Sequence, residues 1–220
     1  MSRGVAKGVV PTRKYDTTRR RAQAADTRDR ILQAAHRLFA KRGYSGTTMQ
    51  AIADEAGIAF QTVYANFKNK RKVLVTLFNI SSAPAGEEST PMPARARTQA
   101  VAREPNQRRQ LQMFAQVVAD NLTGAAPISE IMVDAAQTEP DIRKILEQLD
   151  AQRLEHMALV VRQIAVHGPL RGGLDAASAR DIVWTLASPE VFLLLIRDRG
   201  WSKDKYAAWL ADLLTKALLP

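Results

Sequence analysis

A short stretch of hydrogen-bonding side chains, followed by a run of cations, has the clearest chemistry in this chain. Between residues 60 and 67 the outward positions of an amphipathic pattern hold amides, hydroxyls and small residues, not the glutamates and lysines of a typical solvated helix. Lys68, Lys70, Arg71 and Lys72 follow at once. Amides and hydroxyls can hydrogen-bond base edges, and clustered cations can neutralise phosphates. The segment therefore indicates a nucleic-acid ligand.

Two short helices joined at a glycine would position this face. Thr48 has the hydroxyl of an N-cap, and apolar residues at helical spacing follow it. At Gly57 the chain can leave the first helix through a left-handed residue without a Cβ penalty. The second helix is expected over residues 60–67, with Val63 and Phe67 inward. This order and spacing are typical of a DNA-reading helix-turn-helix; a purely structural helical hairpin is the alternative.

The same segment resembles the signature of the TetR family of one-component transcriptional regulators. The matching residues are Thr48, Met49, Ile52, Ala53, Ala56, Gly57, Ile58, Thr62, Val63, Tyr64, Phe67, Lys70 and Leu74. With the upstream helix, the resemblance covers residues 26–78. It implies an all-α fold, in which a three-helix helix-turn-helix head precedes a larger helical ligand-binding and dimerisation body. One departure is Ala59, which cannot cap the recognition helix where the family often has Ser.

The resemblance also implies which side chains contact double-stranded DNA. Those expected to face base edges are Gln50, Phe60, Gln61 and Ala65. Those expected to hold phosphates are Thr48, Thr62, Tyr64, Asn66 and Lys70. Phe60 is unusual on an exposed helix face, and its ring could pack against a thymine methyl group.

Positive charge is concentrated at one end of the chain. The 220 residues carry a net charge of +10. Residues 1–72 hold sixteen Lys and Arg against five Asp and Glu, whereas residues 73–220 hold sixteen against seventeen. A protein that is merely soluble through its charge would spread the excess, so this asymmetry indicates a basic reading head on a neutral body.

We expect three parts along the chain: a basic flexible arm (residues 1–25), a helix-turn-helix domain (residues 26–72, the head) and a helical ligand-binding and dimerisation domain (residues 73–220, the body). The arm is either a solvated tail or a segment that contacts phosphates or the minor groove. It lacks the apolar segment of a secretory signal. No apolar run approaches the ~20 residues of a membrane span, and there is no Cys. The expected location is cytoplasmic, without a membrane partner.

The body is expected to be helical throughout, since it has no run of period-two alternation. Helices are predicted over residues 70–81, from about Pro105 to Gly124, over residues 127–137, over residues 140–167 and from Asp175 onward with a break at Pro189. A loop rich in Pro, Gly and Ser is expected over residues 81–94.

Wide apolar stripes near the C-terminus predict a homodimer interface, as the family resemblance also implies. A helix that is apolar on every side must be covered on every side. The expected interface residues are Val191, Leu194, Leu195, Tyr206, Leu210, Leu213 and Ala217. An ordinary core helix is the alternative interpretation.

A small-molecule effector is expected in the body, because family members resemble switches that a ligand releases from DNA. The expected lining residues are Met113, Phe114, Val117, Met132, Met157, Val161 and Trp184. Ordinary core packing is the alternative for these residues. No charged residue is expected inside, which favours an apolar or aromatic effector.

Nothing in the sequence predicts catalysis. His36, His156 and His167 are scattered, without the spacing of metal ligands, and no metal or cofactor is expected. The glycines of residues 168–173 follow a helix instead of a strand, so they lack the context of a phosphate loop. Together with these observations, the family resemblance implies a sequence-specific repressor, not an enzyme, which an effector releases from a palindromic operator. The alternative is a nucleoid-type protein that coats DNA without sequence preference.

Overall fold

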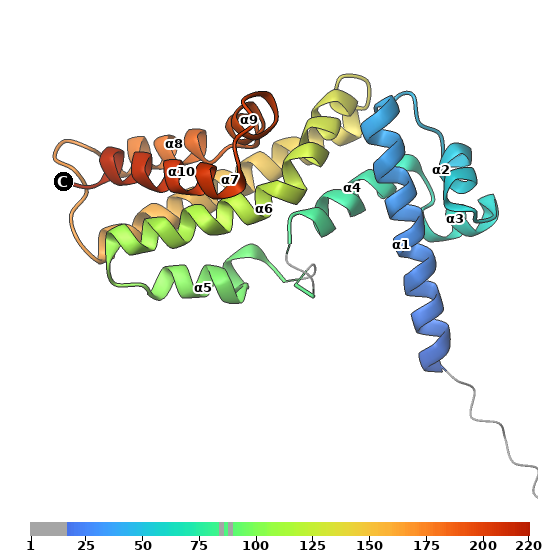
Figure 1. Cartoon of the computed structure of the whole chain (residues 1–220), viewed down its shortest axis with the longest axis horizontal. Coiled ribbons are helices and arrows are strands. Elements are labelled where there is room, and N and C mark those ends of the chain that lie inside the picture. The colour runs from blue at the N-terminus through green and yellow to red at the C-terminus, as the bar shows by residue number, and fades with distance from the viewer. Residues whose placement is uncertain (1–16, 84–85, 88–89) are drawn as a thin grey trace, which may run out of the picture.

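The computed structural model describes residues 17–83, 86–87 and 90–220 (Figure 1). Within these ranges the chain forms helices and loops without a strand, which confirms the all-α prediction. The elements are α1 (Thr17–Arg42), α2 (Met49–Ala56), α3 (Phe60–Phe67), α4 (Lys70–Ser81), η1 (Met92–Ala94), α5 (Ala96–Arg103), α6 (Gln107–Ala136), α7 (Pro140–Val166), α8 (Ala176–Leu186), α9 (Pro189–Leu193), η2 (Leu194–Asp198) and α10 (Lys203–Leu218). No helix in the described ranges has both the length and the apolarity needed to cross a bilayer.

The long helices α6 and α7 form the axis of the molecule, and the other helices are arranged around it (Figure 1). Helices α1 to α3 lie at one end of this axis, and α8 and α10 cover the other end. Helix α4 connects the two regions and packs against α6.

The buried apolar residues form two cores. The first core spans the domain boundary that we expected at residue 72. It joins Ile31, Phe39 and Phe67 of the head to Met132 of α6 and Ile142 of α7, all of them at most 1% exposed. The second core lies in the body, between α5, α6, α7, α8 and α10. Because the corner between α6 and α7 completes the first core, the head is packed directly on the body.

Helix α1 is longer than expected. It begins at Thr17, so residues 17–25 are helical where we expected part of a flexible arm. Alanines and arginines are good helix formers, and they extend a helix already held by its packing downstream. Residues 1–16, the rest of the expected arm, lie outside the described residues.

Helix α6 runs unbroken through Gly124 and Pro127, where we predicted the end of one helix and the start of another. The prediction is wrong because residues on both sides of the expected break are buried: Leu122 packs in the body core and Ile128 in the first core. Their burial outweighs the backbone hydrogen bond that a proline removes. Gly124 has a packing role instead, since a Cβ there would lie 2.5 Å from the carbonyl oxygen of Ser81 at the end of α4.

The expected loop after α4 is confirmed in its described part, with a short helical turn, η1, at its end. Its anchor is Arg95, which is only 8% exposed and donates hydrogen bonds to the carbonyl oxygens of Ser82 (2.6 Å) and Thr90 (3.1 Å). Helix α5 follows directly, and no sequence signal had predicted it.

Candidate nucleic-acid interface

Helix α3 is fixed in its rotation by two residues that point into the first core. Val63 and Phe67 are both 0% exposed, and Ile52 and Ala53 of α2 pack in the same core. The remaining side chains of α3 are therefore directed to solvent, as the sequence pattern predicted.

The turn between α2 and α3 has the geometry that its sequence predicts. Thr48 Oγ1 accepts a hydrogen bond of 3.0 Å from the backbone N–H of Ala51, so Thr48 is the N-cap of α2. Gly57 has a φ of 63° and closes the end of α2 in the left-handed region. Ala59 makes no side-chain cap, which leaves the first N–H groups of α3 available to an anionic partner.

Three arginines of α1 contact α2 and α3 and stabilise this helix pair. Arg30 donates a 2.8 Å hydrogen bond to the carbonyl oxygen of Ala56, at the end of α2. The guanidinium of Arg28 lies 4.9 Å from the ring centroid of Phe67, and Arg37 forms a 2.8 Å ion pair with Glu55. In the sequence, these arginines belong to the excess of positive charge that we expected to face DNA. Arg30 and Arg37, seven residues apart, lie on one face of α1, a signal that could have identified their role.

The outward face of α3 carries a pair of aromatic rings. Phe60 is 38% exposed and Tyr64 is 51% exposed. Their rings are stacked, with centroids 6.2 Å apart and planes inclined by 26°. The ammonium of Lys68 lies 5.7 Å from the centroid of the Tyr64 ring. Gln61 and Ala65 are exposed on the same helix.

The other predicted contact residues are exposed too, and several already make local hydrogen bonds. Gln50 donates to Asp54 at 2.8 Å, and Asn66 donates to the carbonyl oxygen of Thr62 at 2.8 Å. Thr48 uses its oxygen as an acceptor in the cap, so its O–H remains able to donate to a phosphate.

Lys70 stands apart from the other predicted DNA contacts. Its ammonium donates a 2.7 Å hydrogen bond to the carbonyl oxygen of Tyr44 and lies 4.0 Å from the centroid of the Tyr44 ring. Burial lowers the pKa of Lys70, and nearby Glu139 partly opposes this effect. In this arrangement Lys70 holds the loop between α1 and α2 and is directed away from the outward face of α3.

A polar hollow of about 300 Å³ lies between α1 and α3. Helix α1 lines it with one face, and α3 contributes two residues of its outward face. The lining residues are Arg20, Gln23, Ala24, Thr27, Thr62 and Asn66. Since two of them belong to the predicted phosphate contacts, the N-terminal part of α1 lies beside the candidate DNA surface.

The predicted dimer residues separate into two groups. Tyr206 and Leu210 are 0% exposed because they pack in the body core, where the ring of Tyr206 meets that of Phe192 at 4.9 Å. The prediction that these two face a partner is therefore wrong. The other five, Val191, Leu194, Leu195, Leu213 and Ala217, are partly or fully exposed.

An open hollow of about 480 Å³ runs along α8, where none of the seven named interface residues lies. Its lining residues recur every three or four positions and form one helix face: Ser178, Asp181, Ile182, Thr185 and Leu186. Ile182 and Leu186, four residues apart, could have indicated this face from the sequence.

Six of the seven predicted pocket residues lie in or against the body core, but Met132 does not. Met132 is completely buried in the first core with the head residues, so its assignment to the pocket is wrong. The two hollows described above are lined by none of the seven.

The body also contains a partly buried cation, although we expected no charged residue inside it. Arg153 of α7 lies with its guanidinium 4.1 Å from the centroid of the Trp184 ring and donates a 2.8 Å hydrogen bond to the Trp184 carbonyl oxygen. Burial lowers the pKa of Arg153, and Asp150 and Glu190 oppose that effect. The buried Nε1 of Trp184 has no hydrogen-bond partner.

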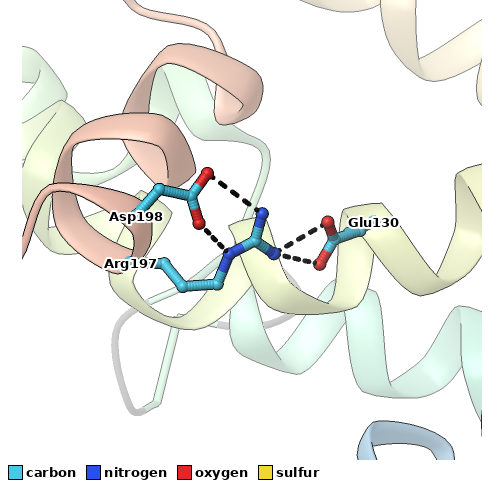
Figure 2. A network of polar contacts seen from close by, with 3 residues as sticks. All are labelled: Glu130, Arg197 and Asp198. Atoms are coloured by element: carbon cyan, nitrogen blue, oxygen red, sulfur yellow. Dashed lines mark hydrogen bonds and ion pairs between the residues drawn. The ribbon is translucent and has the colours of Figure 1, made fainter.

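An exposed ion-pair network connects η2 to the C-terminal part of α6 (Figure 2). Arg197 donates to both carboxylate oxygens of Glu130, at 2.8 and 2.7 Å, and its Nε donates to Asp198 at 2.7 Å. These contacts hold the C-terminal segment against α6 next to the exposed Leu194.

The family model of bacterial regulatory proteins, tetR family, matches residues 31–77. The HTH-type transcriptional regulator TtgR of Pseudomonas putida is 29% identical over 167 residues, 73% of this chain and 76% of that regulator. The crystal structure of NalD, the secondary repressor of the MexAB-OprM multidrug efflux pump in Pseudomonas aeruginosa, matches with a TM-score of 0.67 and 22% identity, covering 90% of this chain and 98% of NalD. The SmeT–triclosan complex matches with a TM-score of 0.65 and 21% identity, covering 89% of this chain and 92% of SmeT.

Proposed function

Since the chain belongs to the tetR family of bacterial regulatory proteins, we propose that it is a sequence-specific DNA-binding transcriptional repressor. In this proposal a homodimer binds a palindromic operator in the cytoplasm, and a small-molecule effector releases it. The head, residues 26–72, contacts DNA, and the body, residues 73–220, dimerises and binds the effector. The observation that carries the proposal is the outward face of α3, with exposed amides, hydroxyls and rings on a helix locked by Val63 and Phe67.

On DNA, α3 lies in the major groove, and its exposed residues divide into two sets. The base contacts are Gln50, Phe60, Gln61 and Ala65, and the phosphate contacts are Thr48, Thr62, Tyr64 and Asn66. The local hydrogen bonds of Gln50 and Asn66 are exposed and can be exchanged for bonds to DNA. Lys68 takes the phosphate role first assigned to Lys70, because the contacts of Lys70 with Tyr44 give it a positioning role.

The dimer forms through α8 and α10. On α10, the partly exposed Trp209, Leu213 and Ala217 recur every four residues, separate from the solvent-exposed stripe that contains Asp212. The open face of α8 provides a second surface around Ile182. A two-fold axis through these faces covers apolar side chains that one chain leaves in water, and an isologous interface needs only this one surface.

The effector site lies in the body, between α6, α7 and α8. SmeT, which has the same fold, was solved in a complex with triclosan, which supports a body able to accept a small molecule. The stacked Arg153 and Trp184, with an unpaired indole N–H, place one polar anchor beside largely apolar walls. An aromatic effector with a hydrogen-bond acceptor fits this chemistry.

Coupling between effector and DNA passes through the corner where the head is packed on the body. Arg71 of α4 pairs with Asp141 at the start of α7. Tyr44 of the head lies close to Glu139 at this corner, and its burial, together with the charge of Glu139, raises its pKa to about 12. An effector that shifts α6 or α7 therefore shifts the head as well. It must bind the arrangement that is incompetent for DNA more tightly, or it moves no equilibrium.

Selection of bound duplexes from a random pool, followed by competition against bulk DNA, tests the function. A specific repressor prefers its selected palindrome by about three orders of magnitude or more. A nucleoid-type protein would show almost no preference, and that result would overturn the proposal. Two variants sharpen the measurement. Gln61→Ala should relax preference at one base pair by ~1–3 kcal/mol, whereas Lys68→Ala should weaken all sites equally and reduce the salt dependence.

A further inference from the structure

The stacked pair of Phe60 and Tyr64 is an apolar surface in the middle of an otherwise polar interface. The first core does not include Phe60, whose ring lies on Tyr64 of the same helix. The inward positions of α3 are already filled by Val63 and Phe67. Packing of α3 onto the head therefore does not account for a phenylalanine at position 60.

The neighbours of this surface identify its partner. Residues 60–67 contain no acidic side chain, and the ammonium of Lys68, just after the helix, lies over the ring of Tyr64. Helix α3 therefore suits a polyanionic partner that also presents an apolar group to the N-terminal end of the helix. In the major groove the base edges present hydrogen-bonding atoms, and the prominent apolar group among them is the C5-methyl of thymine.

We propose that the ring of Phe60, held by stacking on Tyr64, contacts the C5-methyl group of a thymine in each half of the operator. This inference rests on the proposed function and assigns the chemistry of one base pair within it. Recognition at that pair depends on the methyl group, whereas Gln61, the next residue, recognises its base by hydrogen bonds. Stacking limits the motion of the Phe60 ring, so little side-chain freedom remains to be lost on binding.

Replacing thymine by deoxyuridine tests the inference, because it removes the methyl group and keeps the base-pair hydrogen bonds. In the selected palindrome, each thymine is replaced in turn, symmetrically in both half-sites. Loss of one buried methyl corresponds to about fourfold in affinity, so one symmetric position should weaken binding about 15-fold. The other thymines should show smaller effects.

Protein variants connect that position to Phe60. Phe60→Ala should bind the thymine and deoxyuridine operators with equal affinity, and Phe60→Leu should keep most of the discrimination. Val166→Ala, an exposed apolar residue at the far end of α7, is the matched control and should discriminate like the wild type. Circular dichroism and thermal unfolding of each variant separate a folding defect from a contact defect.

A second substitution in DNA uses the same methyl group on a different base. Changing the sensitive T·A pair to C·G in one half-site should weaken binding, and 5-methylcytosine at that single position should recover about fourfold of the loss. No recovery would overturn the assignment of the methyl group.

The outcomes separate this inference from the function on which it rests. Specific binding that is indifferent to deoxyuridine at every position overturns the inference and leaves the repressor intact. Equal loss by Phe60→Ala on thymine and deoxyuridine operators also overturns it, because the ring would then act as a wedge between base steps or through packing alone. Absence of any specific binding refutes the proposed function itself.

Discussion

The head and the C-terminal part of the body cover their apolar residues to very different extents. In the head, Ile52, Val63 and Phe67 are completely buried, and the large apolar side chains exposed between residues 26 and 72 are Phe60 and Tyr64. Along α8, η2 and α10 many apolar side chains are only partly covered, and Leu194 is 53% exposed. The apolar residues of the head are thus mostly covered within one chain, whereas the body leaves an apolar surface that a second copy can cover.

Under the proposed function, this difference assigns different partners to the two regions. A polar surface with two exposed rings matches a ligand with polar edges and a few methyl groups. An extended, partly covered apolar face matches another face of the same kind.

The largest effect is expected from Leu213→Glu, which places like charges near the proposed two-fold axis. Burying an unpaired carboxylate in an apolar setting is strongly unfavourable, so the variant should be monomeric or aggregate. Operator binding should fall by orders of magnitude although the head is intact. Analytical ultracentrifugation and an operator titration measure both properties. Ala208→Glu, on the exposed stripe of the same helix, is the control; a well-folded Leu213→Glu dimer with wild-type affinity would place the interface elsewhere.

Gly57→Ala should destabilise the head by about 1–2 kcal/mol. The φ of 63° is disfavoured for a residue with a Cβ, although a Cβ there would meet only Arg30 at an ordinary 3.6 Å. Gly57→Asn should cost less, because Asn tolerates the left-handed region better. Urea unfolding compares the three proteins. Equal losses for Ala and Asn would show that contact, not backbone conformation, sets the cost.

Gly124→Ala should destabilise the body by about 1 kcal/mol. Alanine improves helix propensity by about 1 kcal/mol, but its Cβ would collide with the carbonyl oxygen of Ser81, and overpacking costs about 1–3 kcal/mol. The same collision displaces α4, so effector-dependent release should also change. A variant more stable than the wild type in thermal unfolding would mean that α4 and α6 separate freely.

The smallest effect is expected from Asp120→Asn, which alters an ion-pair cluster on the body. Burial would raise the pKa of Asp120, but hydrogen bonds from Lys203 and Arg97 outweigh it, and the pKa is lowered. A lowered folded-state pKa contributes stability above the unfolded value of about 3.9, and this contribution is lost as the pH falls through the folded pKa. The variant should be less stable by about 0.5–1 kcal/mol at pH 7. Unfolding in urea at pH 7 and pH 3 should show this difference becoming smaller in acid; a constant difference would exclude the linkage.

The sequence predicted the bounds of α2, α3 and α4 because their signals are local. The cap at Thr48, the left-handed Gly57 and the inward pair of Val63 and Phe67 each act within a few residues. The exposed positions of the candidate DNA face follow from the same rotation of α3, so they could be predicted as well.

Features set by contacts between distant segments could not be predicted. In the sequence Lys70 looks like a free cation, but in the structure it donates a hydrogen bond to Tyr44. Arg30 looks equally free in the sequence, but it donates a hydrogen bond to the end of α2. Gly124 and Pro127 indicate a break when read alone, yet burial on both sides keeps α6 continuous.

The apolar stripe of the last helix is wide, so sequence periodicity could not separate its core residues from its interface residues. Tyr206 and Leu210 face the body core, while Leu213, only three residues further, is partly exposed at the proposed interface. Only the packing of α10 on α6 shows where the core ends and the interface begins.

The central claim is that the body holds two heads at a fixed separation for one palindrome. On the selected operator, the recognition helices should lie about 34–36 Å apart, one turn of DNA. Inserting about five base pairs between the half-sites rotates one of them by half a turn and keeps every base contact available. We predict that binding to the inserted duplex falls to the level of a single half-site in a titration of the intact protein. Equal affinity for the original and the inserted duplex would contradict the account, since each head would then bind independently of the body.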